Sequence, residues 1–577
     1  MSVLKQLRPL YLLVGVVAAA LLAFGLWTRP SAQPADAEGF SSARVVEDIK
    51  VISQEHHSVA PEHTEARSRV REYLAGRLQE LGADTLMRFR YDSLQGPENK
   101  HVVYTFDIEN LLAEFHPLTE SEDTTYLMFV AHFDSRYSQP MPEGLVWSYG
   151  AADDGYGIGV TLEALSHLLK NRAAWKQGVK VLFTDAEEVG MVGMKAQWAN
   201  NREVFDNVGL MINLEARGPF GPCLLFETCP GNEKLMDLYS QFADYKFTYS
   251  LTTVVYTFMP NFTDFTIVKD EIPGLNFSTI TDVNHYHTDK DNFSNVTEAS
   301  IQHYGAQVLP IAMEYVTNPA YADKNYFKSE DDTVNFTVPA MGLFNFSKTV
   351  YAVINVVVFL LFFCLFGLEG VRGRIKATKV FKSSGMTLLT AVVSLVAGLI
   401  VTYVCCLIAG AKFKPFGVIH GVQFDNIAMA VCTAVLAVVL VIIYIAGRNK
   451  AIRASMNSMR SSAMKTAATN FAATRLYGTL ALMFVLSAAL LLAIGENLMF
   501  MVPFTFAVAA IILYRLTSLR FWLFAGIVAT LLHAFSFLFA LSMALTIGAF
   551  GAVMMIAAID LMMLIPMADL YMMREKK

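Results

Sequence analysis

Cysteine is scarce in this sequence, with six residues in a chain of 577. No two of them have the Cys-x-x-Cys spacing typical of a structural zinc site, so nothing indicates a cysteine-ligated zinc domain. Only Cys223 and Cys229 lie outside apolar runs, and their spacing allows either a short-loop disulfide or two free thiols. The other four behave as small hydrophobic residues: Cys364, Cys405, Cys406 and Cys432.

Charge is also sparse, since Asp, Glu, Lys and Arg make up 17% of the residues and the net charge is −6. Neither a basic patch for nucleic acid nor a disordered acidic tail is indicated, so we expect no nucleic-acid partner. Hydrophobic residues make up 54% of the chain, against about 45–50% in soluble domains. They are concentrated in two blocks, with sequence of ordinary soluble composition between them.

The first apolar block runs from Leu10 to Trp27, which is long enough to span a hydrocarbon core. We expect a cytoplasmic N-terminus over residues 1–9, a transmembrane anchor over 10–28 and a linker over 29–44. A cleavable signal peptide is the alternative, because Ala35-Asp36-Ala37 resembles a cleavage site. The apolar run is long for a signal peptide, and that site lies well beyond its end, so the anchor is favoured.

The second block predicts a membrane domain of about seven helices over residues 349–577, so the lipid bilayer is an expected partner. The spans lie near residues 349–369, 386–410, 427–447, 476–494, 497–514, 521–542 and 546–570. With the N-terminus in the cytoplasm, every loop predicted on that side is basic, in agreement with the positive-inside rule. Both termini are therefore predicted in the cytoplasm, and the soluble part on the other side, in a periplasm or a lumen. The spans contain few ionisable groups, which argues against a transporter.

The soluble part predicts an α/β domain over residues 45–318, followed by a linker over 319–348. Helical periodicity over 41–54, 64–83 and 157–171 alternates with strand-like runs over 105–115, 125–134, 179–188 and 208–216. This alternation is typical of a mostly parallel-stranded mixed sheet flanked by helices. Ligands of such sheets gather at the carboxyl ends of the strands.

Histidine and acidic residues stand where those strands are predicted to end. His132 and Asp134 close one strand in "VAHFDSR", and Asp153 and Asp154 precede a Gly-rich helix in "YGAADDGYGIGV". The remaining motifs are "LFTDAEEVGMVG" with Glu187 and Glu188, "MINLEARG" with Glu215, and "NHYHTDKDN" with His287. Taken singly, each motif also fits a helix cap or a polar surface loop. Together, carboxylates at one sheet edge repel one another unless cations neutralise them, which predicts a metal site.

These five motifs, in this order, resemble the M28 family of zinc-dependent peptidases over roughly residues 45–316. The membrane block adds a resemblance to the multi-span endoplasmic-reticulum and vacuolar metallopeptidases and their bacterial relatives. The resemblance implies two zinc ions per active site, with Asp153 bridging them. It assigns His132 and Glu215 to one ion, and Glu188 and His287 to the other. His285 lies two residues before His287 and is the residue most easily mistaken for that ligand.

The resemblance also implies roles for two residues that do not bind metal. Glu187 matches the general base, and Asp134 matches the residue that orients the ring of His132. The implied function is hydrolysis of peptide substrates through a zinc-bound hydroxide, most simply by an aminopeptidase. A carboxypeptidase or dipeptidase, a glutaminyl cyclase-like acyltransferase and a non-catalytic receptor are the alternatives. Arg217 and Tyr256 are weaker candidates for substrate contacts, and the oligomeric state stays open.

Overall fold

The computed structural model describes residues 7–25, 29–95, 105–119, 124–137, 139–141, 144–257, 262–455 and 461–573. These residues form two compact units. An α/β unit comprises the described residues within Leu26–Thr337 together with Gly342–Lys348. A helical unit comprises those within Met1–Gly25 and Thr349–Lys577, with the short segment Val338–Met341.

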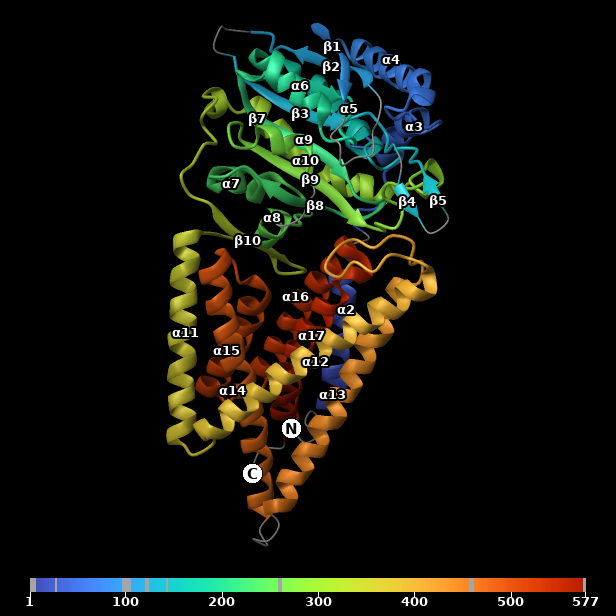
Figure 1. The fold of residues 1–577 in the computed structure, drawn as a ribbon. Coiled ribbons are helices and arrows are strands. Elements are labelled where there is room, and N and C mark those ends of the chain that lie inside the picture. Colours follow the sequence, from blue (N-terminus) through green and yellow to red (C-terminus); the bar gives the residue numbers. More distant parts are fainter. Residues whose placement is uncertain are drawn as a thin grey trace. The chain divides into compact units, whose positions relative to one another are not determined.

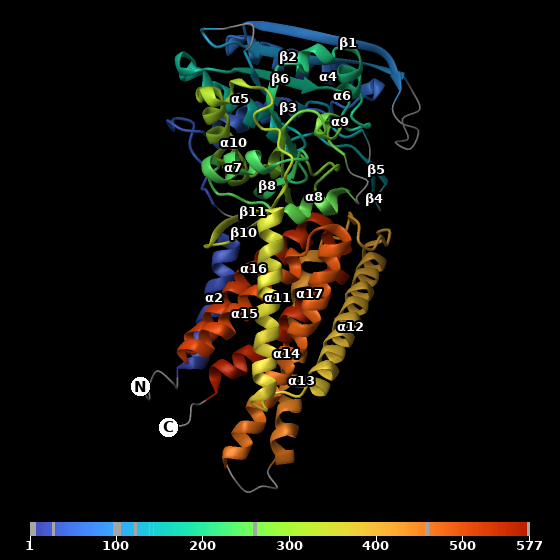
Figure 2. The same cartoon turned by 90° about the vertical axis from the view of Figure 1, so that its left-hand side faces the viewer.

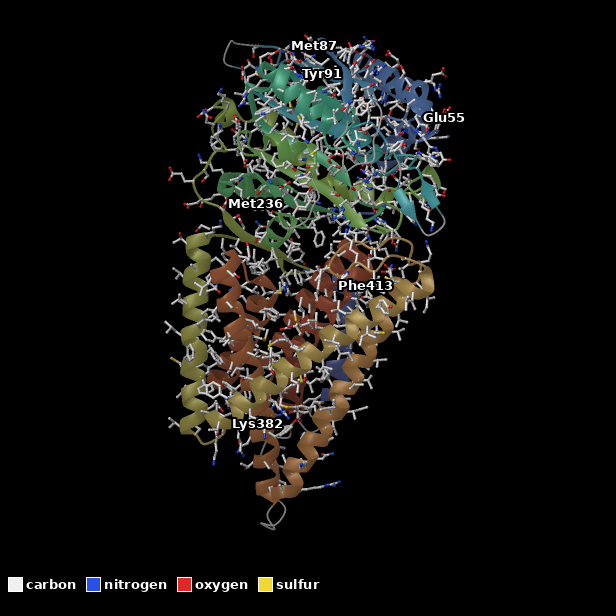
Figure 3. The ribbon with its side chains drawn as sticks, viewed as in Figure 1. Glu55, Met87, Tyr91, Met236, Lys382 and Phe413 are labelled. Atoms are coloured by element: carbon white, nitrogen blue, oxygen red, sulfur yellow. The ribbon has the colours of Figure 1, made fainter. Side chains whose placement is uncertain are left out.

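The α/β unit is built on a mixed seven-stranded sheet in the order β1-β2-β6-β3-β7-β9-β8 (Figure 1). Its strands are β1 (Thr85–Gln95), β2 (Thr105–Phe115), β3 (Tyr126–His132), β6 (Gly178–Thr184), β7 (Val208–Ala216), β8 (Phe220–Thr228) and β9 (Gly274–Thr281). The central strands β6, β3, β7 and β9 are parallel, whereas β1, β2 and β8 pair antiparallel at the two sides. The four parallel strands therefore end at the same edge of the sheet. In Figure 3, Met87 and Tyr91 mark β1, and Met236 marks α7.

Helices flank the sheet because the central strands are buried along their whole length and need apolar cover on both faces (Figure 2). The long helices α5 and α10 pack against the sheet and against α3, whereas α6 packs on β1, β2 and α9. The helices are α3 (Ser42–Ile52), α4 (Thr64–Glu80), α5 (Gly155–Lys170), α6 (Val192–Asn200), α7 (Glu233–Phe242), α8 (Ser250–Thr257), α9 (Asp264–Val268) and α10 (Glu298–Thr317). The core between the layers includes Phe129, Val181, Leu214 and Tyr304, each fully buried. The expected α/β sheet flanked by helices is confirmed.

The N-terminus of α5 has a local cause in the sequence. The side chain of Asp154 accepts a hydrogen bond from the backbone N–H of Gly157 at 3.0 Å and caps the helix. A Cβ at Gly157 would lie 2.4 Å from the Asp154 carboxylate, so a larger residue there would displace the capping side chain. The cap fixes the turn that presents Asp153, whose peptide bond to Asp154 is cis.

The segment 319–348, expected as a linker, is largely folded into the α/β unit. Strands β10 (Thr333–Val338) and β11 (Gly342–Ser347) form a hairpin, and the rings of Phe336 and Phe344 stack at 5.1 Å. Tyr321 and Phe327 are buried in the main core. The polar composition of the segment hid these few aromatic residues, which provide enough apolar surface to bind it to the domain.

Cys223 and Cys229 are both buried free thiols. Cys223 lies in β8 and Cys229 directly follows that strand. Six residues of extended chain span about 20 Å, whereas a disulfide needs Cα atoms within about 7 Å. The disulfide that the spacing allowed is therefore excluded by the strand geometry.

The helical unit contains seven helical segments that are long and apolar enough to cross a membrane. The last segment, Phe521–Met572, is interrupted by a 3-10 turn at Thr546–Ala549, which divides it into α16 (Phe521–Leu545) and α17 (Phe550–Met572). The others are α2 (Arg8–Gly25), α11 (Lys348–Val371), α12 (Ala377–Ala409), α13 (Asp425–Ser455), α14 (Ser461–Ile494) and α15 (Leu498–Thr517). Each span expected from hydropathy falls on one of these helices, within the described residues.

Buried charges stabilise this unit at the ends of its helices, where hydropathy alone showed none. Glu369 is 1% exposed and lies 2.9 Å from Arg515 and 3.3 Å from Arg374. Asp569 accepts hydrogen bonds from Arg448 at 2.8 Å and from the Tyr444 hydroxyl at 2.9 Å. These pairs join α11 to α15 and α13 to α17, which is a structural role.

Candidate metal centre

Five predicted ligands meet at the edge where the parallel strands end. His132 is the last residue of β3, Glu215 lies one residue before the end of β7, Glu188 follows β6, Asp153 precedes α5 and His287 follows β9. They come from five segments that are distant in sequence and that the parallel topology brings together. This convergence is what the order of the motifs predicted.

The five residues form two groups that share Asp153. In the first, His132 Nε2 lies 3.2 Å from Asp153 Oδ1 and 3.8 Å from Glu215 Oε2. In the second, His287 Nε2 lies 3.4 Å from Asp153 Oδ2 and 3.1 Å from Glu188 Oε2. Within each group the ligand atoms lie within 4.8 Å of one another, close enough to hold one cation. His285 belongs to neither group.

Several ligand atoms lack partners that a buried polar atom normally has. Among the described residues, Asp153 Oδ2, Glu188 Oε1 and His287 Nε2 are buried and accept or donate no hydrogen bond. Buried polar atoms left unsatisfied in a native structure call for an explanation, such as an ion. Imidazole nitrogen and carboxylate oxygen are donors that zinc takes readily. The donor types of both groups therefore fit zinc in their chemistry.

The electrostatics of this edge also favour cations. Burial raises the pKa of Glu187 and of Glu215 well above the usual range; repulsion from Glu215 adds to the shift of Glu187, and repulsion from Asp154 and Asp153 adds to that of Glu215. Burial, followed by repulsion from Glu188, raises the pKa of Asp153. Burial alone would raise the pKa of Glu188 too, but the ring of His287 and the guanidinium of Arg136 bring it well below its usual value. Bound cations would remove the repulsion that disfavours the ionised forms.

Asp134 connects the histidine ligand to the segment that carries Glu187 and Glu188. The Nδ1 atom of His132 donates to the backbone oxygen of Asp134 at 3.0 Å and lies 3.5 Å from its carboxylate, which leaves Nε2 free to bind metal. The carboxylate of Asp134 accepts the backbone N–H of Glu187 at 2.8 Å and that of Glu188 at 3.2 Å. The predicted orienting residue thus contacts both sides of the site.

Glu187 adjoins a ligand but is in neither metal group. Its carboxylate is partly buried and makes no hydrogen bond to any described residue, so it is available to a substrate or a water molecule.

Burial raises the pKa of nearby Asp264 to about 6, and the Thr184 hydroxyl donates to that carboxylate. Asp264 begins α9 in "NFTDFT", a context that sequence reasoning did not single out.

Sequence reasoning also missed Asp291, which holds two ligand-bearing loops together. Its carboxylate accepts the backbone N–H of Ala152 at 2.7 Å, that of Asp153 at 3.3 Å and the Ser148 hydroxyl at 2.9 Å. Asp291 is 2% exposed and follows His287 by four residues. The signal was present in "NHYHTDKDN", but nothing in the sequence distinguished Asp291 from the exposed Asp289.

Replacing Asp291 with alanine is expected to weaken zinc binding about 10- to 100-fold, because residues that orient ligands contribute that much. Competition with a chromogenic chelator measures the zinc affinity. Asp289→Ala removes the same charge from an exposed position of the same loop and should leave the affinity unchanged. Equal affinities of the two variants would show that the loop contact does not position Asp153.

The two weaker candidates also lie near this edge. The guanidinium carbon of Arg217 lies 5.5 Å from the centre of the Tyr286 ring, and that ring stacks on His287 with centroids 3.5 Å apart. Tyr256 contacts Phe226 edge to face at 5.1 Å. Burial raises the pKa of Tyr256 and that of Tyr286 well above the usual range, so both remain neutral hydroxyl donors at neutral pH.

The α/β unit therefore combines a mixed sheet with two candidate metal-binding groups at the edge where its parallel strands end. Residues 110–312 of the α/β unit match the profile of Peptidase family M28. Homologues include mouse endoplasmic reticulum metallopeptidase 1, 28% identical over 264 residues, which cover 44% of this chain and 27% of that protein. Vacuolar membrane protease of Eremothecium gossypii is 29% identical over 199 residues, which cover 31% of this chain and 17% of that protein. The matched part is thus about a quarter or less of these relatives.

Solved structures of low sequence identity align with 48% of the chain. They include a Zn-dependent exopeptidase from Parabacteroides distasonis, with 17% identity, a TM-score of 0.37 and 99% of that chain covered. Another is glutaminyl cyclase of Porphyromonas gingivalis, with 18% identity, a TM-score of 0.39 and 100% covered.

Proposed function

We propose that the chain is a membrane-bound di-zinc metallopeptidase that cleaves residues from the end of peptides, in the first place as an aminopeptidase. The observation that carries the proposal is the shared position of Asp153, with one carboxylate oxygen in each ligand group. His132 and Glu215 would complete one zinc site, and Glu188 and His287 the other. The zinc ions would lower the pKa of water toward about 7 and polarise the scissile carbonyl.

The remaining groups of the site supply proton transfer and orientation. Glu187 accepts a proton from the attacking water and delivers it to the nitrogen of the leaving amine. Asp134 holds His132 in one tautomer and fixes the backbone of Glu187. Arg136 donates to the backbone oxygen of Glu188 at 2.7 Å and to its carboxylate at 3.1 Å, which orients that ligand.

We also place the catalytic unit on the non-cytoplasmic side of the membrane, with both chain termini in the cytoplasm. The support is the basic character of the connections predicted to face the cytoplasm, such as Arg372, Arg374 and Lys376 between α11 and α12. Whether that side is a periplasm or a lumen depends on the source cell.

The test uses the purified full-length chain in detergent. Bound zinc is quantified, and cleavage is followed for a panel of peptides with free and with blocked ends. Two zinc ions per chain and cleavage only of peptides with a free amino end are the expected results. Cleavage restricted to free carboxyl ends would identify a carboxypeptidase, and cyclisation of an N-terminal glutamine would identify an acyltransferase. A protein that binds zinc and converts nothing in the panel would overturn the proposal in favour of a receptor.

A further inference from the structure

Arg217 is a cation at the metal edge for which the described part of the chain supplies no anion. It directly follows β7, and its backbone N–H donates to the oxygen of Thr279 at 2.8 Å, which extends the pairing with β9 by one residue. Side chains two residues apart on a strand point to the same side. Arg217 therefore lies on the same side of the sheet as Glu215, which ligates the candidate centre.

The chain turns immediately after this residue, which fixes its position. Gly218 has a φ of +151°, and a Cβ there would lie 2.0 Å from the backbone oxygen of Thr281. The guanidinium itself is held over the ring of Tyr286, which in turn stacks on His287. The guanidinium of Arg217 therefore lies beside Tyr286, whose ring contacts the candidate metal ligand His287.

Two other arginines of the α/β unit each have a carboxylate partner, which Arg217 lacks among the described residues. Arg136, at the same edge, is paired with Glu188 at 3.1 Å. Arg202 lies 4.2 Å over the ring of Trp198 and is also paired with Glu271. Among the residues that the structure describes, Arg217 has neither a carboxylate within 4.0 Å nor a hydrogen-bond acceptor for its guanidinium. A guanidinium presents a planar set of donors that matches a carboxylate in a bidentate pair.

We propose that Arg217 is a specificity-determining residue that binds a carboxylate group of the peptide substrate. The inference rests on the proposed peptidase function and names its substrate class: peptides with an anionic group close to the scissile bond. That group is either the terminal carboxylate of a short peptide, as in a dipeptide, or an acidic side chain. A carboxylate binding in the plane of the guanidinium completes the pairing that the described residues leave open, and the Tyr286 ring remains beside the guanidinium.

The test compares three forms of the alanine-containing dipeptide that the full-length zinc-loaded protein cleaves best. They are the free dipeptide, its C-terminal amide, and an amide in which aspartate replaces the second residue. The wild type should prefer at least one carboxylate-bearing form over the neutral amide by about 10- to 100-fold in kcat/KM. Preference for the free dipeptide assigns the carboxylate to the peptide end, and preference for the aspartyl amide assigns it to a side chain.

In Arg217→Met the ratio of kcat/KM values between carboxylate and neutral forms should fall to near one, and in Arg217→Lys it should fall only in part. Arg202→Met, which removes an arginine from another aromatic ring, should leave that ratio unchanged. The Kd values of the same three forms on zinc-loaded Glu187→Gln protein give a readout without turnover. Cleavage and binding that ignore the carboxylate, or a preference that persists in Arg217→Met, would overturn the role of Arg217 alone. Absence of both cleavage and binding of every form would overturn the peptidase function as well.

Discussion

Replacing Glu187 with glutamine is expected to lower kcat by about 10²- to 10⁴-fold, the usual contribution of general acid–base catalysis. Glutamine keeps the size and hydrogen-bonding shape of the side chain but cannot accept the proton. Because Glu187 is in neither ligand group, the zinc content should stay at the wild-type value. Kinetics on a cleaved peptide and elemental analysis of the same sample measure the two quantities.

A matched control is Glu330→Gln, which makes the same change at an exposed residue of the α/β unit. It should have wild-type kcat and zinc content. If Glu187→Gln loses zinc together with activity, Glu187 is a ligand and the assignment of the base is wrong. If it keeps both, the proton acceptor lies elsewhere, and Asp264 is the next candidate, since burial raises its pKa to about 6.

Replacing Asp153 with asparagine is expected to lower bound zinc from about two ions per chain to less than one, and to abolish peptide cleavage. The reason is that Asp153 contributes an atom to both ligand groups. His287→Ala, which changes one group only, should lose about one ion. Elemental analysis after dialysis against buffered zinc distinguishes these outcomes.

Thermal unfolding shows whether such a variant is folded. Burial and repulsion from Glu188 raise the pKa of Asp153, so its charge destabilises the metal-free protein. Metal-free Asp153→Asn should therefore unfold at a temperature no lower than metal-free wild type. Zinc at about 100 times its Kd should stabilise the wild type by about 2.7 kcal/mol and the variant by much less. Two ions bound to Asp153→Asn would contradict the bridging role.

The parts of the fold that the sequence predicted well are those with a continuous apolar run or a clear strand alternation. The runs over 105–115 and 208–216 coincide with β2 and β7: β7 is buried along its whole length, and the first half of β2 alternates between exposed and buried residues, as a strand does. Strand β9 escaped notice although it is fully buried, since it contains polar residues. Asn276 in β9 is satisfied by Glu227 and Thr263, each at 2.9 Å, and that compensation is visible only in three dimensions.

The residues of the candidate site also differ in how far the sequence alone predicts them. His132, Glu215 and His287 could be predicted as candidate ligands only as a set, because each motif taken singly also fits a cap or a surface loop. Asp291 and Arg136 could not, because their importance comes from contacts with segments distant in sequence. Acidic and basic residues of that kind are common on any surface, so only the packed structure separates them from solvated neighbours.

The outer strand β1 shows how the α/β unit protects an open edge of its sheet. An open sheet edge invites strand addition by a neighbouring molecule, and charged side chains and bulges prevent it. Along β1, Arg88 pairs with Glu109 of β2 at 3.2 Å, and Arg90 pairs with Asp107 of β2 at 3.2 Å. The pairing with β2 is irregular between Tyr91 and Leu94, where Ser93 has a φ of +58°. A second chain that paired with this edge would have to remove water from the paired charges and follow an irregular backbone. Both raise the free energy of strand addition, so the edge resists aggregation.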